Sequence, residues 1–116
     1  MNSLYLPLLG GVIDSTPRHL PSSVIHTIKT YRQACRLAWK LRRVSGLTKR
    51  SLAEQAGLYA SHVTDYFSIN EARRELPAKH VAQVEKILGN TVMSQWLAWQ
   101  ADLTVLEELR AERKRA

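Results

Sequence analysis

The residues best suited to chemistry in this 116-residue chain are short polar side chains in residues 61–68. The polar members are Ser61, Thr64, Asp65 and Ser68, and the apolar residues among them are Val63, Tyr66 and Phe67. Each set recurs every three or four residues, which predicts a helix with one polar and one buried face. Hydroxyl and carboxylate groups on an exposed helix face can form hydrogen bonds with the edges of nucleic-acid bases.

The chain offers little for other kinds of chemistry. It has no paired carboxylates, no nucleophile–base arrangement and no glycine-rich phosphate loop. His19, His26, His62 and His80 do not show metal-ligand spacing with one another or with the single cysteine, Cys35. We therefore expect no catalytic residues, no metal and no cofactor, and one cysteine excludes an internal disulfide.

A second short helix should precede the polar face. Thr48 can cap it, its apolar positions include a small Ala53, and Gly57 suits its C-terminal end. Ala53 permits a close helix crossing, which Val63 would fill six residues after Gly57. Residues 48–67 therefore predict a helix-turn-helix, whose second helix can enter a DNA major groove.

This pattern resembles the helix-turn-helix of the lambda-repressor and Cro-like (XRE-type) family. The resemblance rests on Leu47-Thr48, Ala53, Gly57, Val63 and Tyr66, and with the packing helices it covers roughly residues 36–88. It implies a sequence-specific regulator of transcription that binds double-stranded DNA, most simply a repressor of prophage or mobile-element genes. Such a regulator would bind a two-fold operator as a homodimer.

The resemblance also implies two sets of DNA contacts. The positions that would read bases are Tyr59, Ala60, Ser61, Thr64, Asp65 and Ser68. Phosphate contacts are expected from Lys49, Arg50, His62, Arg73, Arg74 and Lys79. The chain departs from the family at Tyr59, where a small capping residue is common, and no Arg, Gln or Asn projects from this helix. Asp65 would repel phosphate unless a cation such as Arg50 pairs with it.

The charge distribution points to an anionic partner. The formal net charge is +7, and no Asp or Glu occurs between Asp14 and Glu54, where nine Lys and Arg residues fall. A helical stripe is expected from Lys29, Arg32, Arg36, Lys40 and Arg43. Nonspecific binding of nucleic acid or of an anionic surface by this stripe is a rival interpretation.

Taken in order, the segments predict an all-α bundle of about five helices. Residues 1–22 form an irregular arm, in which the apolar stretch 4–13 packs or stays loose. Residues 23–90 form the helix-turn-helix DNA-binding domain, with an extended first helix over about 23–43 and a later helix between Pro77 and Gly89. Residues 91–116 form a C-terminal helix, with a possible break near Ala101-Asp102.

The C-terminal helix has an apolar seam of Trp96, Trp99, Leu103 and Leu106. A dimer interface and ordinary core packing both explain this seam, and core packing is the simpler explanation for Trp96. An alternative function is an antitoxin-like interaction protein, which binds a partner protein through this helix and regulates its own gene through the helix-turn-helix. No bilayer-spanning run and no secretory signal is visible, so a cytoplasmic protein is expected.

Overall fold

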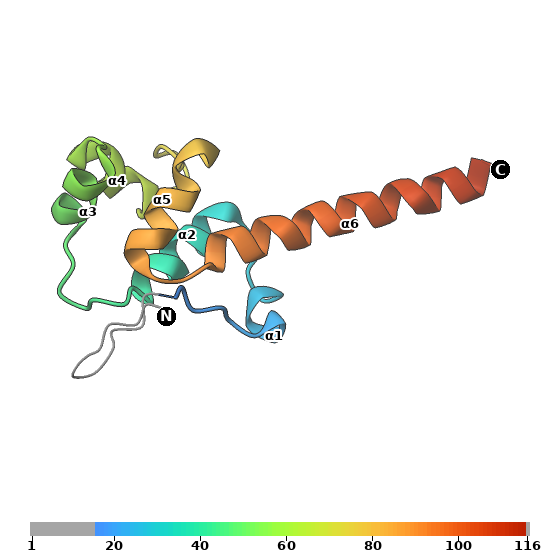
Figure 1. Ribbon diagram of the computed structural model, residues 1–116. Helices are drawn as coiled ribbons and strands as arrows, with labels where there is room; N and C mark the ends of the chain where they lie inside the picture. The colour runs from blue at the N-terminus through green and yellow to red at the C-terminus, as the bar shows by residue number, and fades with distance from the viewer. Residues whose placement is uncertain (1–15, 116) are drawn as a thin grey trace.

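The computed structural model describes residues 16–115, and within them every regular element is an α-helix (Figure 1). The helices are α1 (Ser22–Ile25), α2 (Tyr31–Lys40), α3 (Lys49–Ala56), α4 (Ala60–Tyr66), α5 (Ala78–Leu88) and α6 (Val92–Arg115). This confirms the predicted all-α class. The stretch 4–13, predicted as an apolar arm, lies outside the described residues.

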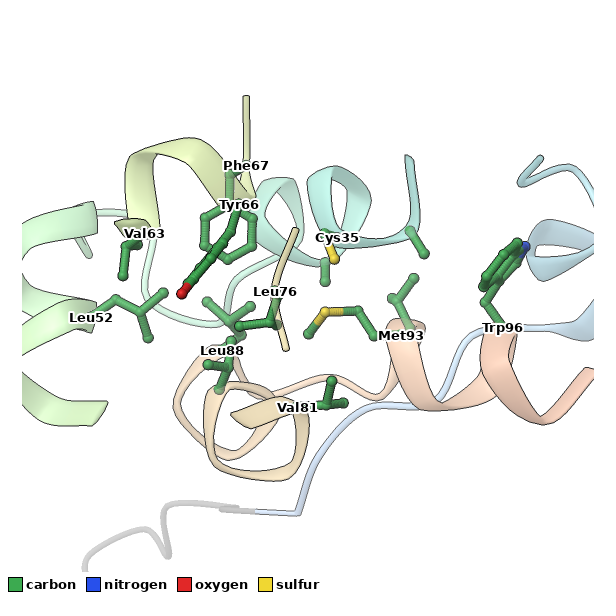
Figure 2. Close-up of a cluster of buried hydrophobic side chains, with 14 of the residues drawn as sticks. Cys35, Leu52, Val63, Tyr66, Phe67, Leu76, Val81, Leu88, Met93 and Trp96 are labelled. Atoms are coloured by element: carbon green, nitrogen blue, oxygen red, sulfur yellow. The ribbon is translucent and has the colours of Figure 1, made fainter. Parts of the chain in front are cut away.

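One hydrophobic core is formed by side chains from α2, α3, α4, α5 and the first half of α6 (Figure 2). Its fully enclosed side chains include Cys35, Leu52, Val63, Leu88 and Met93. The apolar faces predicted for the two motif helices and for α5 thus meet in a common interior, because each helix can bury only one stripe of its surface.

The predicted first helix over residues 23–43 is wrong as a continuous element. It is split into α1 and α2 by residues 26–30, and α2 ends at Lys40. The Thr30 hydroxyl accepts a hydrogen bond from the backbone N–H of Gln33 at 3.1 Å, and the Gln33 side chain accepts one from the N–H of Lys29 at 2.9 Å. This reciprocal arrangement resembles a capping box and starts a new helix at Tyr31.

The predicted ends of α3 are confirmed. The Thr48 hydroxyl accepts from the backbone N–H of Ser51 at 3.1 Å, which caps α3. Gly57 has a φ of 69°, and the N–H of Leu58 donates to the carbonyl of Ala53 at 2.8 Å. This is a Schellman closure, so the chain leaves α3 abruptly and α4 begins after three residues.

Two buried polar side chains fasten α6 to the body. The Asn90 amide donates to the carbonyl of Ala38 at 3.0 Å, just before the end of α2. The Glu85 carboxylate accepts from the backbone N–H of Ser94 at 2.9 Å and also from the Ser94 hydroxyl. Because an anion at a helix N-terminus also interacts favourably with the helix dipole, Glu85 acts as a cap for α6 supplied by α5.

The first half of α6 is anchored and the second half is not. The Trp96 indole donates to the carbonyl of Ile28 at 2.9 Å, and the Gln95 side chain exchanges hydrogen bonds with the backbone of Leu20. Beyond these contacts α6 continues without the expected break and projects from the body (Figure 1). The radius of gyration is 17.2 Å, compared with about 13 Å for a compact domain of 100 residues.

Candidate nucleic-acid interface

The helix α4 buries one face and exposes the other. Val63 and Tyr66 are buried against the core, whereas Tyr59, Ala60, Ser61 and Thr64 are exposed. The Thr64 hydroxyl donates to the carbonyl of Ala60 at 3.1 Å, which leaves its oxygen lone pairs available to an outside donor. The exposed candidates for base reading therefore gather in the first turns of α4.

Two rings stand at the start of α4. Tyr59 is 74 % exposed, and its ring lies edge-on to that of His62 with a centroid separation of 5.1 Å. Tyr59 holds the N-cap position without forming a side-chain cap hydrogen bond. Its side chain is therefore not used to start the helix and is free to contact a ligand.

The helix α3 packs against α4 and carries two cationic side chains in its first turn. Arg50 is exposed at the first turn of α3, and no acidic residue lies in that turn. Lys49 is half-buried, with its ammonium group 5.9 Å from the ring centre of Trp39. Arg42 stacks closer on the same ring, at 4.4 Å, and its guanidinium also donates to three backbone carbonyls, so Arg42 is a structural residue.

A buried arginine orders the loop between α4 and α5, residues 67–77. Arg32 is 2 % exposed, and its guanidinium donates to the carbonyls of Asp65, Ser68, Arg73 and Arg74 at 2.5–3.1 Å. One side chain thus holds the C-terminal end of α4 beside the far part of the loop. A cation at a helix C-terminus also interacts favourably with the helix dipole.

The predicted basic stripe on the first helix is wrong at Arg32, which is buried. The stripe loses this member to the interior, and the guanidinium of Arg43 donates to the carbonyl of Thr16. Arg36 and Lys40 remain exposed, and they line a hollow of about 570 Å³ beside Trp39. Helical spacing alone could not distinguish the buried Arg32 from the exposed Arg36 and Lys40. Whether an arginine at such a position is exposed depends on the segments that pack around it.

The two C-terminal candidates of α4 are less available than the first four. The carboxylate of Asp65 pairs with Arg74 at 2.9 Å, and not with Arg50 as considered from the sequence. Ser68 is half-buried, and its hydroxyl accepts from the backbone N–H of Asn70 at 3.1 Å. The Asp65–Arg74 pair neutralises the acidic charge of α4 and holds Arg74 near the helix.

The remaining phosphate candidates lie on the surface near these elements. Arg73 is exposed in the loop that Arg32 orders, and the side chain of Arg74 is 57 % exposed despite its ion pair. Lys79 is exposed in the first turn of α5, two residues after the N-cap residue Pro77. Two of these three cations are therefore in the segment fastened to the end of α4.

The four residues predicted for dimerisation divide between core and surface. Trp96 is 8 % exposed and belongs to the core, as the simpler of the two interpretations has it. Trp99 is half-buried and stacks on His26 with ring centroids 4.4 Å apart. Leu103 and Leu106 are exposed, at 38 % and 49 %. The part of the seam that remains uncovered thus begins after Trp99.

The titrating groups with shifted pKa values lie in the core and not at this surface. Burial raises the pKa of the Cys35 thiol to about 12. Burial also raises the pKa of Tyr31 far above its ordinary value, and its hydroxyl donates to the carbonyl of Leu76 at 2.8 Å. Both groups stay protonated at neutral pH, which fits a structural role.

Within residues 16–115, no helix is long and apolar enough to cross a bilayer, and no cluster of three or more His, Cys, Asp or Glu side chains could hold a metal ion. No protein-family model matches this chain, and comparisons with curated proteins and with solved structures likewise find no match. The lambda-repressor resemblance therefore stays a prediction from the sequence.

Proposed function

We propose that this chain is a sequence-specific regulator of transcription that binds double-stranded DNA through α4. The observation that carries the proposal is the exposed polar face of α4, with Arg74 held at Asp65 near the C-terminal end of this helix and Arg50 exposed on the neighbouring α3. A short helix with polar and small side chains on its outer face fits the major groove, in which the N-terminal residues of a recognition helix contact the bases.

The division of labour follows from the chemistry of the two sets. Arg50, Arg73 and Lys79 would neutralise phosphates, which sets the register and most of the salt-sensitive affinity. The Ser61 hydroxyl can donate to or accept from base edges, the Thr64 hydroxyl can accept from them, and Ala60 can contact a thymine methyl group. Asp65 contributes by holding Arg74 rather than by reading a base.

The biological role that we propose follows the same resemblance. The chain would act in the cytoplasm as a repressor of prophage or mobile-element genes, by occupying a promoter. A helix-turn-helix that occupies a promoter excludes polymerase by volume alone, so no effector or cofactor is required.

The first experiment is selection of bound duplexes from a randomised pool at about 150 mM salt, where purely electrostatic binding is weakened. Enrichment of a defined sequence is the expected result. If no sequence is enriched and binding disappears as salt rises, the chain is a nonspecific polyanion binder and the proposal fails.

Paired variants then separate the two kinds of contact on the selected duplex. Arg50→Ala should weaken binding to all sequences alike and reduce the salt slope by about one. Thr64→Ala should change which base is preferred at one position of the site. Lys86→Ala, which removes an exposed charge from the last turn of α5, serves as the matched control and should bind normally. If Arg50→Ala and Thr64→Ala have the same effect on every sequence, α4 does not read bases.

A further inference from the structure

The distal part of α6 exposes an apolar face that nothing in the described chain covers. Every residue from Ala101 to Arg110 is exposed, including Leu103, Leu106 and Leu109 at 38–49 %. This part of the helix stands apart from all other elements (Figure 1). An isolated helix of this length is only marginally stable in water, because helices in proteins owe most of their stability to packing. Packing against a partner along this face would therefore stabilise the distal part of α6.

The sequence of this segment is symmetric about Leu106. Leu103 and Leu109 lie three residues before and after it. Asp102 and Arg110 lie four residues before and after it, and they carry opposite charges. With about 100° between successive residues, both leucines fall within about 60° of Leu106 and both charged residues within about 40°. One face thus carries three leucines, with an acid at one end and a base at the other.

We propose that α6 pairs antiparallel with α6 of a second copy of this chain, with the crossing point at Leu106. A two-fold axis at this point brings Leu103 of each copy against Leu109 of the other. The same axis brings Asp102 of each copy against Arg110 of the other. Every contact then occurs twice, as it must in an isologous interface.

The charges along α6 select the antiparallel direction. Asp102, Glu107 and Glu108 precede a basic end made of Arg113, Lys114 and Arg115. A parallel pair in register would place Asp102 against Asp102, Arg110 against Arg110 and the two basic ends together, whereas an antiparallel pair sets Asp102 against Arg110, separates the basic ends and opposes the helix dipoles. Within residues 16–115 the ion pair is that of Asp65 with Arg74, so the charges of α6 have no intrachain ion-pair partner.

A second copy fits this face better than an unrelated protein would. An unrelated partner needs complementarity to α6, but it does not need α6 to be complementary to itself. The anchored Trp96 lies ten residues before Leu106, which separates the two bodies by about 30 Å along the helix pair. The bodies thus lie at opposite ends, and α4 stays outside the contact. The proposal does not depend on nucleic-acid binding.

Charge reversal tests both the pairing and its register. Sedimentation velocity of the full chain at protein concentrations of about 1–100 μM should show a dimer. Asp102→Arg alone or Arg110→Asp alone should weaken the dimer about tenfold or more, because each change places like charges opposite one another twice. The double variant with both changes should restore dimerisation, since it exchanges the two signs.

The double variant also controls for misfolding, because it contains both changes. A chain that stays a monomer throughout this range would overturn the proposal and leave the face to a different protein. A dimer that neither single change weakens, or that the double variant does not restore, would place the interface elsewhere.

Cysteine cross-linking distinguishes the two directions while the leucines are kept. In the antiparallel pair, Asp102→Cys and Arg110→Cys chains should form a disulfide with each other when mixed. Either variant alone should not, because the two copies of one position lie about 12 Å apart along the axis. A parallel pair in register would cross-link each variant with itself, which would contradict the proposal. The native Cys35 is 1 % exposed and does not interfere.

Discussion

The loop between α4 and α5 and the distal half of α6 are both surface segments, and they are ordered by different means. In the loop, one buried side chain, Arg32, binds four backbone carbonyls that water would otherwise solvate. In distal α6, the backbone is satisfied within the helix, but the apolar face is exposed. The loop is ordered by contacts within one chain, whereas the apolar face of distal α6 is left uncovered by the described residues.

The two regions differ in the kind of interaction that they use: directional hydrogen bonds in the loop and non-directional apolar contact on α6. Burying a guanidinium is costly unless its donors are satisfied, so Arg32 restrains the loop to the geometry in which its two terminal nitrogens find carbonyl acceptors, while its Nε–H has none among the described residues. Apolar contact is non-directional, so the face of α6 does not depend on any one residue to keep its shape. We therefore expect the first region to respond sharply to single changes in the monomer and the second to respond weakly.

The largest effect is expected from Arg32→Ala. The change removes a large buried side chain together with the donors to four partly buried carbonyls of α4 and the loop, and it should lower the free energy of unfolding by about 3–5 kcal/mol. Urea denaturation followed by circular dichroism measures this loss. Arg36→Ala, an exposed arginine one helical turn further along α2, is the matched control and should stay within about 0.5 kcal/mol of the parent. Equal effects of the two changes would contradict the clamp.

A smaller effect, confined to high pH, is expected from Cys35. Burial raises the pKa of its thiol from an ordinary value of 9.0 to about 12, so the unfolded chain releases this proton before the folded chain does. The stability that this group contributes below pH 9 should therefore decline as the pH rises towards 12, by about 1 kcal/mol at pH 10.

Cys35→Ala isolates this contribution, because the lysines and tyrosines remain in both chains. The variant should show a shallower fall in unfolding free energy between pH 8 and pH 10.5, measured by urea denaturation at each pH. If the two curves are parallel, the thiol ionises equally in the folded and unfolded chains, and it is not enclosed.

The smallest effect on the monomer is expected from Leu109→Ala. At protein concentrations low enough to prevent association, the free energy of unfolding of the body should change by less than about 0.5 kcal/mol, as for other surface substitutions. Thermal unfolding of dilute protein followed by tryptophan fluorescence measures this, since the tryptophans report on the body. A loss as large as that of Arg32→Ala would mean that distal α6 folds back on its own chain.

Local signals in the sequence predicted several structural details correctly. Thr48 and Gly57 set the ends of α3 through a hydroxyl and a permitted positive φ, and Gly89 ends α5 with a φ of 81°. Val63 is fully buried, as the small Ala53 required. These features depend on residues within one or two turns of each other, so the pattern alone contains them.

The wrong prediction of one continuous helix over residues 23–43 could have been avoided from the sequence. Thr30-Tyr31-Arg32-Gln33 matches the capping-box spacing, which predicts a helix start at Tyr31, but the apolar periodicity across residues 23–43 suggested one long helix instead. The capping hydrogen bonds prevail because Thr30 and Gln33 satisfy N–H groups that a continuous helix would bond differently.

The sequence by itself determined the helical class, the two motif helices with their turn, the excess of positive charge and the self-complementary pattern about Leu106. Only the tertiary structure decided that Arg32 is a buried clamp, that Asp65 pairs with Arg74, and that Trp96 is core while Leu106 is surface. The reason is physical. Helical spacing states which residues share a face, but the free energy of a charge or a large apolar group depends on the atoms that distant segments bring against that face.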